Sequence, residues 1–361
     1  MLYFGGEHAR EWITTTVPTY FANHLLSRYG TDPVVTDLVD NVEFFLVPVF
    51  NVDGYEYSRN VDRFWRKNRR NNGDGTFGVD LNRNWGVGWG GTGSSSATNS
   101  LIYRGTAPFS ELETQVLRNF FLAHDNIRAQ LDIHSYAQLI LWPFGYTPSL
   151  PADQSTYGEI GAQMQSLIMN VHGTPFGAGP TYSTTFPEAG VSIDWTYAER
   201  GIMSLSLELR DTGFYGFTLP ADQIVPSNEE LIPAMLHMTN ADWVRAPFRL
   251  EFPIGIPDHL IAGQPTVITV EAVPQSETIV PGSLLLHYRP FWDGTLLGGS
   301  AHFHRGYGVR SRAAADALCR VTRFLLYSAG VGRLALEPAR GCTESRSLFV
   351  ENDDGHDRVF L

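Results

Sequence analysis

The segment Gly5 to Trp12 combines residue types that can bind a metal ion. It follows a short apolar run and places His8 three residues before the carboxylate of Glu11. On a tight turn both side chains can point at one cation, and two histidines with one glutamate form a known catalytic ligand set for zinc, with one position left open for water. A His-x-x-Glu pair also occurs often by chance, as a surface histidine beside a helix-capping glutamate. Further ligands must therefore come from elsewhere in the chain.

Five other motifs combine arginine, asparagine, histidine or carboxylate side chains with apolar residues. They are Phe64–Lys67, Gly78–Trp85, Asp132–Tyr136, Ser192–Trp195 and Glu208–Gly213. With the first segment, they occur in the order and at the distances typical of the carboxypeptidase A and B family of zinc peptidases, which this chain resembles from residue 2 to about residue 245. The resemblance implies a metallocarboxypeptidase that hydrolyses the C-terminal peptide bond of peptides and proteins.

The resemblance implies one zinc ion per chain. His8, Glu11 and His134 correspond to its ligands, and Asp80 corresponds to a carboxylate that orients a ligand imidazole. His134 follows an apolar run, at the carboxyl end of a predicted strand, where open α/β sheets place their sites. A lone histidine there is more often structural, so the ligand role depends on its matching partners.

Two residues correspond to catalytic groups of the family. Glu208 resembles the general base that takes a proton from a zinc-bound water and later delivers it to the leaving amine. Arg66 resembles the residue that stabilises the oxyanion of the tetrahedral intermediate. Without the surrounding match, a carboxylate at a strand end is more often solvated or paired with a neighbour such as Arg210.

Seven residues are assigned to substrate binding by the same resemblance: Arg10, Asn82, Arg83, Ser135, Tyr136, Phe186 and Ile193. Arg83 with Asn82 resembles the pair that binds the terminal carboxylate, a group that guanidinium binds through two parallel hydrogen bonds. Ile193 occupies the pocket-floor position where basic-specific relatives carry an acid, so we expect substrates that end in hydrophobic or aromatic residues. For Arg10, contact with the substrate and no specific role stay equally open.

The chain departs from the family pattern in three places. Phe186 stands where the family has a mobile tyrosine, and Tyr182 is a nearby alternative source of the lost hydroxyl. The chain starts one predicted strand before His8, whereas family catalytic domains begin several dozen residues earlier, so we expect an exposed strand edge or apolar patch where sheet partners are missing. The third departure is a C-terminal module that the catalytic core does not need.

Short apolar runs alternate with helix-length segments in residues 1–245, which predicts helices around a largely parallel or mixed sheet. The resemblance makes this a zinc carboxypeptidase-like α/β fold. The expected strands are Leu2–Phe4, Glu43–Val49, Ala129–Ile133 and Met203–Leu209, and the expected helices are Trp12–Arg28, Ser110–His124, Tyr157–Val171 and Asn228–Val244. The Gly-, Ser- and Asn-rich stretch from Trp85 to Ser100 predicts a long loop.

A length of 361 residues favours a second domain, which we place at residues 246–361 as a β-rich accessory module. Prolines divide its first half into short segments, of which Thr266–Val270 and Leu284–Tyr288 have strand patterns. The alternation fades after about Trp292. His302 and His304 have no third metal ligand nearby, and Cys319 and Cys342 can form one disulfide or stay two thiols.

Composition excludes some classes of partner and location. The formal net charge of -12 argues against nucleic acid as a partner. No apolar run approaches the roughly 20 residues of a membrane span, and the first residues show no signal peptide. The family resemblance nevertheless implies an extracellular or periplasmic protein.

Two further functions stay open. The same fold and metal can hydrolyse another amide, such as a cell-wall peptide or an acylated amino acid, although Asn82, Arg83 and Ile193 favour ordinary peptide C-termini. A non-catalytic peptide-binding or scaffold protein is the third possibility, which the complete ligand set and Glu208 argue against. A C-terminal module that anchors or sorts the protein is compatible with each of them.

Overall fold

The computed structural model describes residues 1–245 and, beyond them, the segments 248–251, 265–274, 291–292, 295–296, 322–327, 332–337 and 347–352. The chain forms two compact units, Met1–Arg245 and Ala246–Leu361, each defined by contacts among its own residues. Among the described helices, none combines the length and the apolar character that a bilayer crossing requires.

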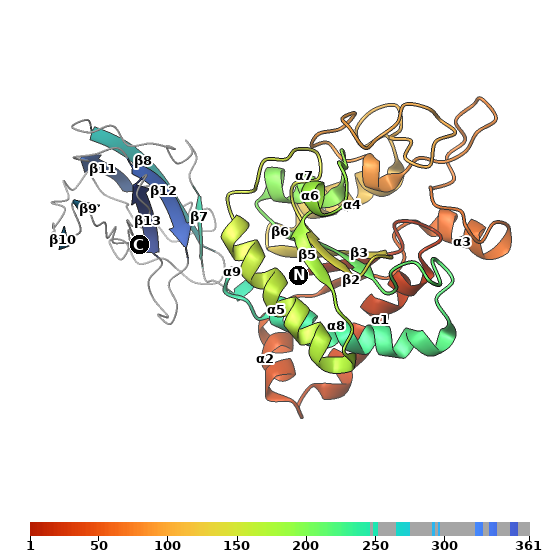
Figure 1. The fold of residues 1–361 in the computed structure, drawn as a ribbon, viewed down its shortest axis with the longest axis horizontal. Coiled ribbons are helices and arrows are strands. Elements are labelled where there is room, and N and C mark those ends of the chain that lie inside the picture. The colour runs from red at the N-terminus through yellow and green to blue at the C-terminus, as the bar shows by residue number, and fades with distance from the viewer. Residues whose placement is uncertain are drawn as a thin grey trace. The chain divides into compact units, whose positions relative to one another are not determined.

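A six-stranded mixed sheet forms the centre of the first unit (Figure 1). Its strands are β1 (Leu2–Gly5), β2 (Phe45–Val47), β3 (Ala129–Ser135), β4 (Leu139–Trp142), β5 (Gly177–Pro180) and β6 (Met203–Leu209), in the order β2-β1-β3-β6-β4-β5. β2, β1, β3 and β6 are parallel, whereas β4 runs antiparallel to β6 and parallel to β5. The predicted mixed sheet is confirmed, and each predicted strand ends within two residues of its observed bounds.

The helices of this unit are α1 (Thr16–Arg28), α2 (Pro33–Asn41), α3 (Val52–Asn60), α4 (Leu112–Ala123), α5 (Gln154–His172), α6 (Thr181–Thr184), α7 (Ser192–Arg200), α8 (Ile224–Thr239) and α9 (Asp242–Arg245), with short 3₁₀ turns at Trp12–Thr15, Leu81–Arg83 and Ala221–Gln223. The prediction of one helix over Asn228–Val244 is wrong at both ends. α8 begins four residues earlier because Pro226 is tolerated in a first turn, and it ends at Thr239, where Asn240 caps it. The stretch from Trp85 to Ser100 contains no helix or strand, as predicted.

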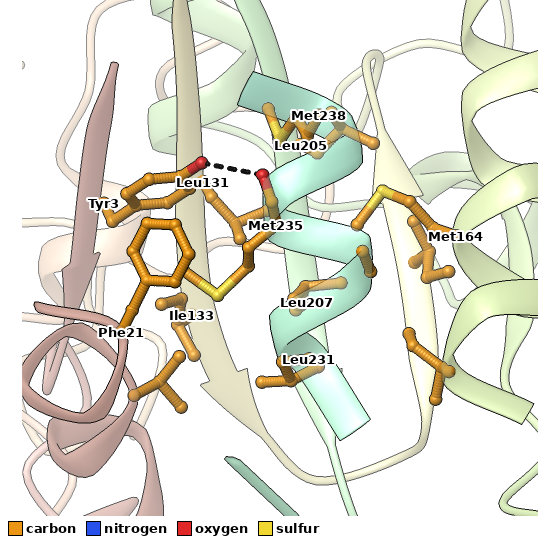
Figure 2. Packing of buried hydrophobic residues seen from close by; sticks show 14 of the residues in the cluster. Tyr3, Phe21, Leu131, Ile133, Met164, Leu205, Leu207, Leu231, Met235 and Met238 are labelled. Atoms are coloured by element: carbon orange, nitrogen blue, oxygen red, sulfur yellow. Dashed lines mark hydrogen bonds between the residues drawn. The ribbon is translucent and has the colours of Figure 1, made fainter. Parts of the chain in front are cut away.

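Alternation along the strands separates the two faces of the sheet. One face carries aliphatic side chains such as Leu131 of β3 and Leu205 of β6, which pack against α1, α5 and α8. Figure 2 shows Met235 of α8 among them, with the Tyr3 hydroxyl donating a hydrogen bond to its carbonyl oxygen at 3.3 Å. Each fully buried aliphatic side chain contributes roughly 1.5–3 kcal/mol, so this face anchors β3 and β6 firmly.

The opposite face of the same two strands is polar. On β3 and β6 the alternate positions are Gln130, Asp132, His134, Ser204, Ser206 and Glu208. Two neighbouring strands therefore present a row of polar side chains, buried except for Glu208, on the face that α4 and α7 cover.

In the second unit, the structure describes the strands β7 (Phe248–Glu251), β8 (Pro265–Pro274), β9 (Phe291–Trp292), β10 (Thr295–Leu296), β11 (Thr322–Tyr327), β12 (Gly332–Glu337) and β13 (Ser347–Asn352). The predicted strand Thr266–Val270 lies within β8. The segment Leu284–Tyr288, both cysteines, His302 and His304 lie outside the described residues. The β-rich module and its boundary therefore stay predictions.

Candidate active site

Three parallel strands bring the predicted site residues to one edge of the sheet. β1 ends at Gly5, where a Cβ atom would lie 2.5 Å from the carbonyl oxygen of Thr14. Gly6 then takes φ of 68°, a left-handed conformation that glycine adopts without strain, and turns the chain towards His8. On the neighbouring strands, His134 of β3 is paired in register with Glu208 of β6.

His8, Glu11 and His134 converge on one point. Nδ1 of His8 lies 2.8 Å from Oε1 of Glu11 and 3.1 Å from Nδ1 of His134, which lies 3.2 Å from Oε2 of Glu11. Tetrahedral coordination with bonds of about 2.0–2.1 Å separates ligand atoms by about 3.3 Å. Since three buried donor atoms already have nearly this spacing, the arrangement fits one zinc ion.

The outer nitrogen of His8 faces a carboxylate. Its Nε2 lies 3.2 Å from Oδ1 of Asp80, while Nη2 of Arg66 donates a hydrogen bond to Oδ2 of Asp80 at 2.9 Å. Burial disfavours the charged carboxylate, but Arg66 and His8 beside it hold the pKa of Asp80 well below its usual range. An ionised Asp80 keeps the proton of His8 on Nε2 and leaves Nδ1 free for a metal.

His134 has an equivalent partner that sequence reasoning missed. Its Nε2 lies 2.9 Å from Oδ1 of Asp132 and 3.5 Å from Oε2 of Glu7. Oδ1 of Asp132 is close enough to His134 for an ion pair but accepts no hydrogen bond. The hydroxyl of Ser192 donates a hydrogen bond to Oδ2 of Asp132. The sequence did contain a signal for Asp132. It lies two residues before His134 on the same strand, so the two side chains share one face of the sheet.

Glu7, Asp132 and His134 form a second group of possible ligands. This group uses Nε2 of His134, whereas the first group uses Nδ1. If Nδ1 binds a metal, Nε2 carries the ring proton, so the second group orients the ring instead of holding another ion. Burial raises the pKa of Glu7 to about 7, and the charge of Asp132 acts in the same direction.

A cavity of about 220 Å³ opens beside His8, Glu11 and His134. The predicted residues that line it are His8, Glu11, Arg66, Asn82, Arg83, His134, Ser135, Tyr136, Phe186, Ile193 and Glu208. Asp80 lies behind His8, and the Arg10 guanidinium is stacked over Phe217, 4.0 Å from the ring centroid. Neither Arg10 nor Tyr182 lines the cavity.

Glu208 is partly exposed to this cavity. Loss of solvation raises its pKa to about 8; the charge of His134 opposes this shift and that of Glu11 adds to it. A divalent cation held by the neighbouring ligands would lower this pKa by electrostatic attraction. Arg210 forms its ion pair with Glu230, so the pairing of Glu208 with Arg210 that a strand-end carboxylate suggests is not formed.

Arg83 is almost fully buried, and its guanidinium has three partners. Nε donates to the carbonyl oxygen of Gly93 at 2.8 Å, and Nη1 donates to that of Asn82 at 2.6 Å. Nη2 lies 2.9 Å from Oε2 of Glu188, another residue that sequence reasoning missed. Glu188 follows Phe186 by two positions in an irregular segment, where no periodicity marks it.

The motif Ser192–Trp195 opens α7 and forms one wall of the site. The Ser192 amide donates to Oδ1 of Asn82 at 3.0 Å, and Ile193 is buried at the cavity wall. Phe186 is 58% exposed and lines the cavity. The wall beside Ile193 is thus apolar and the one beside Arg83 is charged.

Comparisons with known proteins agree with this geometry. The family model of zinc carboxypeptidases matches residues 1–234. Carboxypeptidase A2 of Rattus norvegicus is 43% identical over 227 residues, or 62% of this chain and 54% of that protein. Carboxypeptidase A1 of Sus scrofa is 42% identical over 232 residues, or 64% and 55%. The chain spans about half the length of the curated relatives it matches.

Two solved structures have the same fold. Bovine thrombin-activatable fibrinolysis inhibitor, in complex with tick carboxypeptidase inhibitor, superposes with a TM-score of 0.63 at 35% identity, covering 66% of this chain and 80% of that one. Carboxypeptidase A from Helicoverpa armigera superposes with a TM-score of 0.61 at 31% identity, covering 68% and 61%.

Proposed function

Since this chain belongs to the zinc carboxypeptidase family, we propose that it is a zinc-dependent exopeptidase that removes the C-terminal residue of peptides and proteins. The observation that carries the proposal is the convergence of a complete His₂Glu donor set, Glu208 and Arg83 on one cavity. From the family alone, we also propose an extracellular or periplasmic location.

The proposed metal ligands are His8, Glu11 and His134, for one zinc ion per chain. When bound, zinc polarises a carbonyl group and lowers the pKa of water towards about 7. Asp80 and Asp132 support the site by holding the outer nitrogens of the two histidines, at 3.2 Å and 2.9 Å.

The proposed chemistry uses Glu208 as both base and acid. Its carboxylate accepts a proton from the attacking water while the water oxygen bonds to the carbonyl carbon of the last peptide bond. The same carboxyl group then delivers the proton to the amide nitrogen as the carbon–nitrogen bond breaks. Arg66, which lines the cavity 3.9 Å from Glu11, donates to the oxyanion that forms between these steps.

The proposed substrate contacts explain the exopeptidase character. Arg83 and Asn82 bind the free terminal carboxylate, which an internal peptide bond does not have. Ile193 provides an apolar wall for the last side chain, so C-terminal Phe or Leu should be released faster than C-terminal Arg. The reverse order of rates would contradict this specificity. Ser135, Tyr136 and Phe186 line the remaining cavity.

Glu208→Gln tests the proposal. The substitution keeps the size of the side chain but removes its ability to take a proton, so turnover should fall roughly 100-fold or more. Zinc content by mass spectrometry and binding of a C-terminal dipeptide analogue should persist. Glu199→Gln, at an exposed position of α7, is the matched control.

Activity and binding measurements on several classes of substrate separate the alternatives. Full activity in Glu208→Gln would remove Glu208 from the reaction. Hydrolysis of acyl-amino acids or cell-wall peptides without hydrolysis of ordinary peptides would favour the other amidase. Binding without turnover by the wild-type protein on every such substrate would favour the peptide-binding protein.

A further inference from the structure

The carboxylate of Glu188 lies in the cavity beside Arg83, the residue proposed to bind the terminal carboxylate of the substrate. Oε2 of Glu188 lies 2.9 Å from Nη2 of Arg83, and the Arg83 side chain is only 2% exposed. The other two contacts of Arg83 go to backbone carbonyl oxygens. Glu188 is therefore the one residue that forms a direct ion pair with Arg83 among the described residues.

The backbone of Glu188 is held in place on two sides. Its amide donates to the carbonyl oxygen of Gly145 at 2.8 Å, and a Cβ atom on Gly145 would approach the Glu188 carbonyl oxygen to 2.7 Å. On the other side, a Cβ atom on Gly93 would lie 3.0 Å from Cα of Glu188. Both positions need glycine, which lets the two loops close around this segment.

The Glu188 side chain is less restrained than its backbone. It is 16% exposed, lines the cavity and, apart from Arg83, has the Thr185 hydroxyl as a donor at 3.2 Å. That hydroxyl also lies 2.8 Å from the carbonyl oxygen of Thr181, so it has an alternative acceptor. The cavity lies beside the carboxylate, so there is space into which it can be displaced from Arg83.

Building on the proposed function, we propose that Glu188 is a specificity-determining residue that occupies Arg83 in the free protein and has to be displaced by the terminal carboxylate of the substrate. Two carboxylates at one guanidinium repel each other, and the substrate has to replace the ion pair that Glu188 forms with Arg83. Glu188 thereby weakens the preference for a free C-terminal carboxylate over a neutral C-terminal carboxamide.

The charge of Glu188 also reaches the reacting groups. Burial is the main cause of the raised pKa of Glu208, and the Glu188 carboxylate adds to it. Displacement of Glu188 from Arg83 thus changes the field in the cavity as well as the occupancy of the guanidinium.

Calorimetry with two uncleavable dipeptide analogues tests the inference. Both analogues end in leucine, one as the carboxylate and one as the carboxamide, and both are titrated into zinc-loaded protein. In Glu188→Ala, affinity for the carboxylate analogue should rise roughly tenfold, because the carboxylate that competes for Arg83 is removed. Affinity for the carboxamide analogue should change by less than about twofold. Glu188→Gln should show a smaller gain in the same direction, and the exposed Glu199→Ala should show none.

Three results would overturn the inference. Unchanged or weaker carboxylate binding in both Glu188 variants would make the pair with Arg83 a fixed structural contact. Equal gains for the two analogues would indicate added space in the cavity instead of relieved competition. Binding of neither analogue to any variant would mean that Arg83 does not receive a C-terminus.

The binding measurement does not require turnover, so it is judged separately from the proposed function. Wild-type protein that binds the carboxylate analogue but hydrolyses no peptide would refute the exopeptidase while the Glu188 comparison still decides the inference. In an active protein, the kinetic counterpart is a lower KM with nearly constant kcat in Glu188→Ala.

Discussion

Asp132→Asn should weaken zinc binding without unfolding the protein. The substitution keeps the size of the side chain and its contact with Ser192, but it removes the negative charge 2.9 Å from Nε2 of His134. A neutral partner no longer stabilises the proton on Nε2 or raises the basicity of Nδ1, which is the atom that faces the metal site.

The structure sets the expected magnitude. Loss of a carboxylate behind a metal-binding histidine typically costs 10–100-fold in metal affinity. Asp132 is fully buried, which favours a large effect, but Glu7 lies 3.5 Å from the same nitrogen and can take over part of its role. The contact is also not a linear hydrogen bond. We therefore expect a loss near the lower limit, roughly tenfold.

The assay is competition for zinc with a chromogenic chelator at fixed pH, with thermal unfolding as the check on folding. Asp80→Asn is the comparison, because Asp80 lies behind the other histidine at 3.2 Å and also binds Arg66. It should lose zinc affinity and, in addition, turnover. Zinc affinity of Asp132→Asn within about twofold of wild type, beside a clear loss in Asp80→Asn, would refute the orienting role of Asp132.

Two further predictions concern pH and the cavity mouth. Burial raises the pKa of Asp194 from 3.8 to about 7, although the amides of Gly145 and Tyr146 donate to it. The folded state then binds the Asp194 proton more tightly than the unfolded state does. The contribution of this proton to the free energy of unfolding is therefore fully present below about pH 4 and is lost as the pH rises through about 7. Urea unfolding of Asp194→Asn should lack this decline, worth on the order of a few kcal/mol, and an unchanged pH profile would contradict the argument. Phe186→Tyr should lower KM by a modest factor at nearly constant kcat, whereas a fall in activity would show that residue 186 does not correspond to the family tyrosine.

The sequence predicted most strands in which local pattern and tertiary pairing agree, but it missed β4, although Leu139–Trp142 consists of strand-forming residues. β3 and β6 have long apolar alternation and are central in the sheet, so their bounds were close to correct. β5 was not predicted because Gly177–Pro180 has no strand-forming side chain, and its extended form comes from pairing with β4. α2 has a capping Asp32 followed by proline, a helix start signal that was present but not used.

The site was predictable to the extent that its residues match family motifs. The motif residues around the cavity come from segments whose spacing is visible in the sequence. Asp132, Glu7 and Glu188 were missed because their importance depends on which charges lie next to them after folding. A family resemblance assigns roles to the residues that match the family motifs. The roles of residues that differ from the motifs can be inferred only from their distances and burial in the structure.

The charges around the cavity are compatible with a bound divalent cation. Glu7 and Glu208 have pKa values raised to about 7 and about 8, so both bind protons readily near neutral pH. Four further carboxylates pair with the guanidinium groups of Arg66 and Arg83 and with the two histidines. Burial opposes protonation of His8 and His134, but the neighbouring carboxylates raise the pKa of both histidines. Binding of one Zn²⁺ ion to the two histidines would displace their protons and supply two positive charges in their place. The four carboxylates are Glu11, Asp80, Asp132 and Glu188. The buried charges and the donor geometry are therefore both compatible with a divalent cation, one through electrostatics and one through coordination.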